Sequence, residues 1–345
     1  MKILVTGSAG FIGASLAYRL AERGDEVIGI DNINDYYDVR LKYARLRECG
    51  IVPAGKEFEF GNEIVSDRFA NLSFRRIGLE DKAAVDALYS NQRFDVVVNL
   101  AAQAGVRYSI ENPYAYLHCN VEGFLNVLEA CRHNGVKKLV FASSSSVYGL
   151  NSQVPYGEDD KCDTPVSLYA ATKKSDELMA HCYSMLYGIQ CIGLRYFTVY
   201  GPWGRPDMSP MLFAEAIRKG ESIKVYNNGD MARDFTYIDD IVEGTVRAVD
   251  YVLQAETCHN NVPYKVYNIG CGHPVKLMDF IAEMEQAFGM SVQKQLMPMQ
   301  PGDVYQTHAD TSSLQNDMGY CPKWSLHEGI IEFAQWYNSE ANPLK

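Results

Sequence analysis

The stretch that decides the fold is Thr6-Gly7-Ser8-Ala9-Gly10-Phe11-Ile12-Gly13, near the start of the chain. It follows Lys2–Thr6, a short apolar run with β-branched residues, which predicts a buried strand. After the glycines, apolar residues recur at helical spacing, at Ile12, Leu16 and Leu20, and Gly24 ends the predicted helix. A second strand-like run, Glu26–Ile30, comes next. The segment therefore predicts a strand, a helix and a second strand parallel to the first.

The same alternation continues through the first two hundred residues. We expect further strands at Val96–Leu100, Lys138–Ser143 and Ile189–Leu194, and helices at Asp38–Glu48 and Asn120–His133. Another helix starts at Ser167, carries a stripe of Ala171, Ser175, Leu178 and Cys182, and stops at Gly188. Strands that alternate with helices predict an α/β fold, a doubly wound parallel sheet of the Rossmann type.

The pattern changes beyond residue 200, where short strands such as Ile223–Tyr226 and Lys265–Ile269 mix with helices and turns. We interpret this part as a smaller α/β domain that caps the carboxyl edge of the sheet, where such sheets bind ligands. We place the first domain at residues 1–195, with a later segment at about 235–255 returning to it. The second domain takes most of residues 196–345.

Composition excludes several classes of protein. The chain has 345 residues, of which 47% are apolar and 22% charged, with a net charge of −11. An acidic chain is poorly suited to bind nucleic acid or a membrane surface, and no apolar stretch is long enough to cross a bilayer. The nine cysteines include no Cys-x-x-Cys pair, which argues against zinc and a disulfide framework. From the cysteine pattern we expect no metal and a cytoplasmic location. Since the glycine loop begins almost at once, we also expect no signal peptide.

Gly7, Gly10 and Gly13 have the spacing G-x-x-G-x-x-G. Absent side chains allow backbone to approach a pyrophosphate, and the N-terminus of the following helix attracts its charge. Asp31 stands where a carboxylate binds ribose hydroxyls, and no arginine adjoins it, so we expect NAD rather than NADP. The alternative is a tight turn without a ligand, which the strand before the glycines and the acid after the second strand disfavour.

Tyr169 and Lys173 are four residues apart, on one face of the predicted helix. Free tyrosine has a pKa of about 10, and a nearby ammonium favours its phenolate form. A serine from Ser143–Ser146, at the tip of a predicted strand, would hold the hydroxyl from which the phenolate takes a proton. An isolated Tyr-x-x-x-Lys pair usually lies on a solvated helix face. The pair predicts catalysis here because the glycine loop and the serines occur in the same chain.

The ordered motifs TGxxGxxG, SSxxVYG and YxxxK resemble those of the extended short-chain dehydrogenase/reductases, the nucleotide-sugar epimerases and dehydratases, over essentially the whole chain. Counting back three residues from Val147, the resemblance implies that Ser144 acts with Tyr169 and Lys173 in catalysis, although Ser145 and Ser146 are close enough to replace it. It also implies a homodimer formed by helices within 111–133 and 167–187, and a nucleotide sugar bound mainly by the second domain. The implied NAD contacts are Gly7, Gly10, Phe11, Ile12, Gly13, Asp31, Asn32, Leu79, Leu100, Ala101, Ala102, Asn120, Tyr169, Lys173 and Phe197. The implied contacts with a UDP-sugar are Arg107, Ser144, Ser145, Tyr169, Thr198, Arg205, Tyr226, Arg233 and Asp303.

The absence of carboxylate side chains directly before Val147 limits the reactions that the chain could catalyse. Relatives that remove water or CO₂ carry carboxylates at the positions of Ser145 and Ser146, and serine cannot do such acid–base work. The run Arg195-Tyr-Phe-Thr-Val-Tyr-Gly-Pro-Trp-Gly-Arg-Pro-Asp-Met208 looks like the signature of UDP-glucuronate 4-epimerases, as do Asn34–Val39 and Met299–Val304. The resemblance implies NAD-dependent 4-epimerisation of UDP-glucuronate to UDP-galacturonate through a 4-keto sugar. Alternatives are epimerisation of UDP-glucose or UDP-N-acetylglucosamine, decarboxylation of UDP-glucuronate, and a non-catalytic NAD-binding regulator.

Several assignments have alternatives. Thr198 and Arg205 suit a sugar carboxylate, but Arg205 could instead pair with Asp207, and Arg233 with Asp234. Tyr226 is a candidate to stack on uracil or a core tyrosine at a strand end. The chain departs from the family at Gly78, where an aspartate often binds adenine. We expect Glu80 or Asp81 to substitute, or a looser contact.

Overall fold

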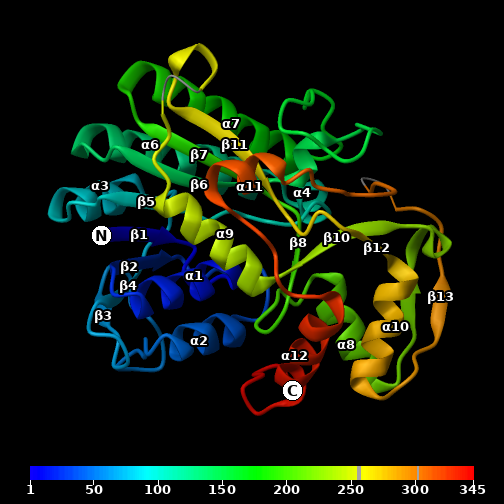
Figure 1. Cartoon of the computed structure of the whole chain (residues 1–345). Helices are drawn as coiled ribbons and strands as arrows, with labels where there is room; N and C mark the ends of the chain where they lie inside the picture. The colour runs from blue at the N-terminus through cyan, green and yellow to red at the C-terminus, as the bar shows by residue number, and fades with distance from the viewer. Residues whose placement is uncertain (255–257, 301–302) are drawn as a thin grey trace.

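The computed structural model describes residues 1–254, 258–300 and 303–345. An eight-stranded sheet with the order β11-β7-β6-β5-β1-β2-β4-β3 forms its centre (Figure 1). Neighbouring strands are parallel except for β3, which pairs antiparallel with β4 at one edge. The strands are β1 (Lys2–Thr6), β2 (Glu26–Asp31), β3 (Glu63–Val65), β4 (Leu72–Arg76), β5 (Val96–Asn99), β6 (Lys138–Ser144), β7 (Gln190–Tyr196) and β11 (Tyr264–Ile269).

Helices cover both faces of this sheet. One layer contains α1 (Phe11–Glu22), α2 (Val39–Glu48) and α9 (Ile238–Asp250), and the other contains α3 (Lys82–Asn91), α6 (Gly123–Asn134) and α7 (Leu168–Tyr187) (Figure 1). Alternate residues of β1 enter two separate cores, Ile3 and Val5 on one face and Leu4 on the other. Because both faces are buried, the central strands are apolar throughout, and the predicted Rossmann-type doubly wound sheet is confirmed.

Most of the remaining elements gather beyond the carboxyl ends of the central strands, whereas α11 (Ser312–Met318) packs on β11 and α9 (Figure 1). A three-stranded sheet has the order β12-β10-β8, and β9 pairs with β13. Helices α8, α10 and α12 pack together beside them. Their bounds are β8 (Thr198–Tyr200), α8 (Ser209–Lys219), β9 (Ile223–Val225), β10 (Ala232–Tyr237), β12 (Pro274–Lys276), α10 (Leu277–Phe288), β13 (Lys294–Leu296), α11 (Ser312–Met318) and α12 (Leu326–Asn338). Short helical turns are α4 (Tyr108–Glu111), α5 (Pro113–Tyr116), η1 (Leu117–Glu122), η2 (Ser145–Tyr148), η3 (Tyr226–Gly229) and η5 (His259–Asn261).

One strand lies in a different sheet from the one that we expected. We assigned Lys265–Ile269 to the smaller domain, but β11 pairs in parallel with β7 and forms an edge of the large sheet. A short strand pairs wherever an open edge with matching register exists, and composition alone does not identify that edge. Helix α9, in contrast, packs on α1, within the segment that we expected to return to the first domain.

Helix α7 has its apolar and polar faces in unexpected places. Its predicted stripe includes Leu178, whose side chain is 58% exposed, and Cys182, which is also exposed. The face turned to the sheet buries Lys173, Asp176 and Glu177 instead. Buried charges require partners, so this face must meet charged or polar groups from the strands.

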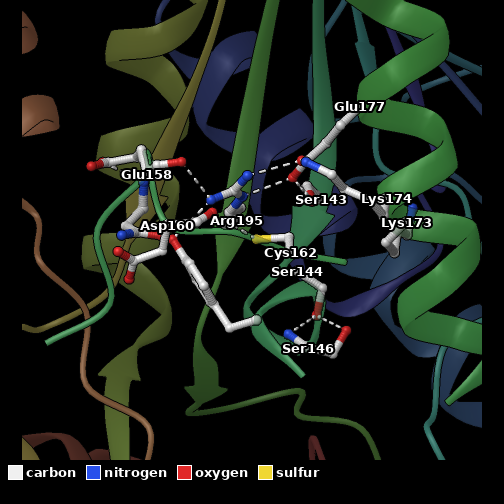
Figure 2. A network of polar contacts seen from close by, with 12 residues as sticks. Ser143, Ser144, Ser146, Glu158, Asp160, Cys162, Lys173, Lys174, Glu177 and Arg195 are labelled. Atoms are coloured by element: carbon white, nitrogen blue, oxygen red, sulfur yellow. Dashed lines mark hydrogen bonds and ion pairs between the residues drawn. The ribbon is translucent and has the colours of Figure 1, made fainter. Parts of the chain in front are cut away.

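Arg195 on β7 supplies the main partner. Its Nε and Nη2 donate to the two carboxylate oxygens of Glu177 at 2.8 and 2.9 Å, across the space between strand and helix (Figure 2). Ser143 Oγ at the end of β6 donates to the same carboxylate at 2.6 Å. Burial alone would raise the pKa of Glu177, but the hydrogen bonds and charge of Arg195 outweigh it and lower that pKa. The pair therefore joins α7 to β6 and β7.

None of the helices in the described ranges is both long enough and apolar enough to span a bilayer.

Removing one partner of this buried pair should be costly. We expect Glu177→Ala to lower the free energy of unfolding by about 3–5 kcal/mol, because Arg195 is left charged and unpaired in the interior. Urea unfolding followed by circular dichroism measures the change. Glu215→Ala is the matched control, since it breaks an exposed pair with Lys219 on α8 and should barely move the midpoint. An equal shift in both variants would contradict the assignment.

Candidate active site

A cavity of about 410 Å³ opens at the carboxyl ends of the central strands and is also lined by residues of β8 and of the segment around residues 303–307. It brings together residues that are far apart in the sequence. The predicted site residues that line it are Gly7, Gly10, Phe11, Ile12, Gly13, Asp31, Asn32, Leu79, Leu100, Ala101, Ala102, Ser144, Ser145, Tyr169, Lys173, Phe197, Thr198, Arg205, Arg233 and Asp303. Among the described residues, no group of three or more His, Cys, Asp or Glu is arranged to hold a metal ion.

The glycine loop between β1 and α1 leaves no room for side chains. Gly7 has a φ of 71°, and a Cβ on Gly13 would lie 2.1 Å from the carbonyl oxygen of Gly7. Thr6 Oγ1 donates to Asn99 Oδ1 at 2.7 Å and accepts from Ala101 N–H at 3.0 Å, which fixes the loop against the end of β5. The N-terminus of α1 thus faces the cavity behind a bare backbone, and these residues fit the pyrophosphate of a dinucleotide.

Asp31 ends β2 at the cavity wall and lies 8% exposed. Its Oδ1 accepts from Ile33 N–H at 2.7 Å and its Oδ2 from Ala9 N–H at 3.3 Å. Lys42, from α2, places Nζ 3.6 Å from Oδ1. No arginine adjoins Asp31 in the sequence, and the approach of Lys42 could not be predicted, because Lys42 comes eleven residues later on a helix whose position depends on the tertiary fold. A ribose hydroxyl could bond both groups.

Glu80 occupies the space left by Gly78. A Cβ at Gly78 would lie 2.3 Å from Glu80 Oε1, and Asn32 Nδ2 donates to the same oxygen at 3.3 Å. Asp81, the other residue that we considered for this place, instead caps α3 by accepting from Ala84 N–H at 3.0 Å. The carboxylate available at this end of the cavity is therefore that of Glu80.

Tyr169 and Lys173 both reach the cavity from the first turns of α7. Lys173 Nζ donates to the carbonyl oxygen of Ala142 at 2.9 Å and to Asp176 Oδ2 at 3.2 Å. Burial alone would lower the pKa of Lys173, but the charges of Asp176 and Tyr169 outweigh it, so the pKa is raised and the ammonium persists. A cation held there favours the phenolate of Tyr169.

The serines at the tip of β6 divide into two groups. Ser143 Oγ turns back to Glu177, as described above. Ser144 Oγ accepts from Ser146 N–H at 3.2 Å and from Ser146 Oγ at 2.9 Å (Figure 2). Ser144 begins the turn η2, and its own hydroxyl hydrogen remains available for a ligand. This geometry is compatible with Ser144 in the role that the family resemblance implies, and the role stays a prediction.

Arg205 forms the ion pair with Asp207 that we considered as its alternative role, with Nη2–Oδ2 2.5 Å and Nε–Oδ1 3.0 Å, yet it still lines the cavity. Tyr36 OH donates to Asp207 Oδ2 at 3.0 Å. Burial would lower the pKa of Arg205, but the charges of Asp207, Tyr37 and Tyr169 outweigh it and raise that pKa. Arg205 is therefore a fixed cation whose charge acts on Tyr169. Thr198, from β8, lines the same cavity.

Arg233 and Arg107 both approach Asp303, with nitrogen–oxygen distances of 3.6 and 3.7 Å. The Arg107 guanidinium lies 5.4 Å from the ring centre of Tyr226. Asp234 is not the partner of Arg233: its carboxylate accepts backbone N–H groups of Cys271, Gly272 and Ala309 at 2.8–3.1 Å. Pro301 and Gly302, within the predicted signature at 299–304, lie outside the described residues.

Three predicted contacts are not among the cavity-lining residues. Arg107 lies beside Asp303, which lines the cavity, and Tyr226 lies beside Arg107. Asn120 lies behind the wall, where Oδ1 accepts from Gln103 N–H at 2.8 Å and Nδ2 donates to Thr172 Oγ1 at 3.0 Å. Asn120 holds the backbone of Gln103, which lines the cavity, and so contributes to the cavity wall indirectly.

Comparisons with known proteins agree with this geometry. A model of the NAD dependent epimerase/dehydratase family matches residues 3–270. Protein CapI of Staphylococcus aureus is 47% identical over 98% of each chain, and the probable UDP-glucuronate 4-epimerase of Rhizobium meliloti (strain 1021) is 42% identical over 98% of this chain and 97% of its own. The crystal structure of UDP-glucuronic acid 4-epimerase from Bacillus cereus, in complex with UDP-glucuronic acid and NAD, covers 97% of this chain and 98% of its own, with 33% identity and a TM-score of 0.83. The chain belongs to the NAD dependent epimerase/dehydratase family.

Proposed function

We propose that this protein is an NAD-dependent UDP-glucuronate 4-epimerase, which interconverts UDP-glucuronate and UDP-galacturonate through a 4-keto sugar. The observation that carries the proposal is a fixed cation, Arg205, in the same cavity as the Tyr169–Lys173 pair. A uronic acid bears its carboxylate on C5, next to the reacting C4, so its recognition needs a cation close to the catalytic phenol. The likeness to the Bacillus cereus enzyme supports the same substrate.

When bound, NAD would supply the hydride acceptor for C4 of the sugar and, as NADH, the hydride donor for the opposite face of the ketone. Tyr169 takes the proton of the C4 hydroxyl, with Lys173 stabilising the phenolate before and after the transfer. Ser144 holds the C4 oxygen by a hydrogen bond. The proton then returns from Tyr169 when the ketone is reduced, so that protons and electrons balance over one turnover.

The positions of the carboxylates that line the cavity favour epimerisation over the other fates of the ketone, because none of them belongs to the tip of β6. They are Asp31 and Glu80 at the dinucleotide end and Asp303 beside Arg233 at the other end. Ser145 and Ser146 stand at the tip of β6, where water loss would need an acid and a base. Rotation of the ketone and reduction of its other face need only the groups already named.

Decarboxylation must also be suppressed, because a 4-keto uronate is a β-keto acid. Carbon dioxide leaves readily only when the breaking bond overlaps the carbonyl π system. Thr198 and Arg205 can hold the carboxylate near the ketone plane, where that overlap is lost. The Asp207 and Tyr36 contacts keep Arg205 in place for this task.

We further propose that the protein is a cytoplasmic homodimer. Its nine cysteines are free thiols, as expected in a reducing compartment. Large apolar side chains are exposed along α4, α5, η1, α6 and α7: Ile110, Tyr114, Leu117, Leu125, Leu178, Met185 and Leu186. Such a patch on neighbouring helices is expected at a protein interface, and a second copy would cover it symmetrically.

Incubation with UDP-glucuronate, with and without added NAD, tests the reaction. We expect UDP-galacturonate as the product, identified by NMR, and a loss of about 10²–10⁴-fold in rate for Tyr169→Phe. UDP-glucose and UDP-N-acetylglucosamine are the comparison substrates. A UDP-pentose product would instead indicate a decarboxylase, and failure to turn over any UDP-sugar would favour a non-catalytic role.

Thr198→Val should loosen the hold on the carboxylate. We expect epimerisation to fall about 10- to 100-fold, the value of a hydrogen bond to a charged group. The fraction of turnovers that release CO₂ should rise, which product analysis by NMR measures. Thr198→Ser keeps the hydroxyl and should retain the wild-type ratio. If Thr198→Val leaves that ratio unchanged, Thr198 does not restrain the carboxylate.

The proposed dimer is tested by charging its surface. Leu186→Asp on α7 places a carboxylate in the apolar patch, so we expect monomers at micromolar concentration in analytical ultracentrifugation. Leu296→Asp on β13 is the control, since Leu296 is 57% exposed but lies away from α7. A monomeric wild type, or a dimer that survives Leu186→Asp, would argue against this interface.

A further inference from the structure

Asp176 is a buried carboxylate next to the catalytic lysine, and the mechanism above gives it no task. Its side chain lies on the sheet-facing side of α7 and is 2% exposed. Oδ2 accepts from Lys173 Nζ at 3.2 Å, while Oδ1 has no hydrogen-bond partner among the described residues. An ionised carboxylate in such a place is poorly solvated, which costs free energy unless the charge is paired, and Lys173 is the partner that Oδ2 finds.

Lys173 connects Asp176 to the catalytic tyrosine. The ammonium has three donors, of which one is given to Ala142 and one to Asp176. The same ammonium acts through its charge on Tyr169. An ionised Asp176 offsets part of the positive charge that favours the phenolate, whereas a protonated Asp176 leaves that charge whole.

We propose that Asp176 is a positioning residue that holds Lys173 and, by gaining or losing its own charge, sets how strongly Lys173 favours the phenolate form of Tyr169. The proposal rests on the proposed function only for the meaning of the phenolate in catalysis. Burial raises the pKa of Asp176 to about 7, against the opposing effect of Lys173, so this charge changes around neutral pH.

The other charged groups around the pair come from several elements. Glu177, next to Asp176, is paired with Arg195 from β7 and with Lys174, and its negative charge also helps to raise the pKa of Asp176. Cys119 from η1 faces Lys173, and burial raises the pKa of its thiol to about 12, so it stays neutral. Tyr264 from β11 and Glu129 from α6 act on Glu177 and Tyr183 rather than on Asp176. Asp176 is thus the group near Lys173 whose charge varies around neutral pH.

Asp176→Asn tests the proposal, because it keeps the shape and an acceptor oxygen but removes the charge. In the NAD-loaded protein, the tyrosinate absorbance of Tyr169 is obtained by subtracting the same titration of matched Tyr169→Phe variants. We expect the midpoint of this titration to fall by about 0.5–1 pH unit in Asp176→Asn, the effect of one partly screened charge. The titration should also become steeper, since two coupled groups titrate over a broader range than one.

The acid limb of the kcat profile should move by the same amount if the proposed reaction is right. If no UDP-sugar is turned over, the absorbance titration still decides the role of Asp176. Asp86→Asn on α3 is the control, since it removes an exposed carboxylate paired with Lys82 and should move neither curve.

Stability gives an independent readout. Because the folded pKa of Asp176 is raised, the protonated carboxyl contributes stability that is fully present below its unfolded pKa of about 4 and is lost as the pH rises through about 7. The Tm of the wild type should therefore fall more between about pH 5 and pH 8 than that of Asp176→Asn.

Asp176→Ala is made in parallel and should give the same lowered midpoint of Tyr169. An unchanged midpoint in a folded variant overturns the proposal. If neither variant folds, Asp176 is a structural residue and the proposal is equally overturned.

Discussion

The hydrogen-bonded pair of Glu177 and Arg195 is the interaction on which the geometry of the proposed catalytic residues depends. It joins helix α7 to strand β7, and Ser143 adds strand β6 to the same carboxylate. The residues before Glu177 on α7 include Tyr169 and Lys173, and the residue after Ser143 is Ser144. One buried carboxylate thus sets the position of the phenol, the ammonium and the serine hydroxyl relative to one another.

Much of this arrangement could be predicted from local sequence. The glycine loop, the acid after the second strand and the Tyr-x-x-x-Lys pair each depend on residues within one turn or one helix, where spacing determines geometry. The doubly wound sheet followed from the alternation of strands and helices. The substrate class followed from the resemblance of the segment at 195–208, and Thr198 and Arg205 line the same cavity as Tyr169 and Lys173.

What could not be predicted depends on tertiary contacts. The edge position of β11, the approach of Lys42 to Asp31 and the contact of Tyr36 with Asp207 join segments whose separation along the chain says nothing of their distance in space. Helix α7 was harder for another reason. Its buried face is charged and its exposed face is apolar, so the usual rule that apolar residues face the core points the wrong way.

This inversion has a consequence for how the enzyme would be regulated by its own abundance. If the protein is the homodimer that we propose, helix α7 contributes its outer, apolar side to the subunit interface and its inner side to the proposed catalytic groups. Disturbing the helix from outside would tilt the inner groups as well. Specific activity would then decline on dilution, and a change at the subunit surface could resemble an active-site defect in kinetic assays.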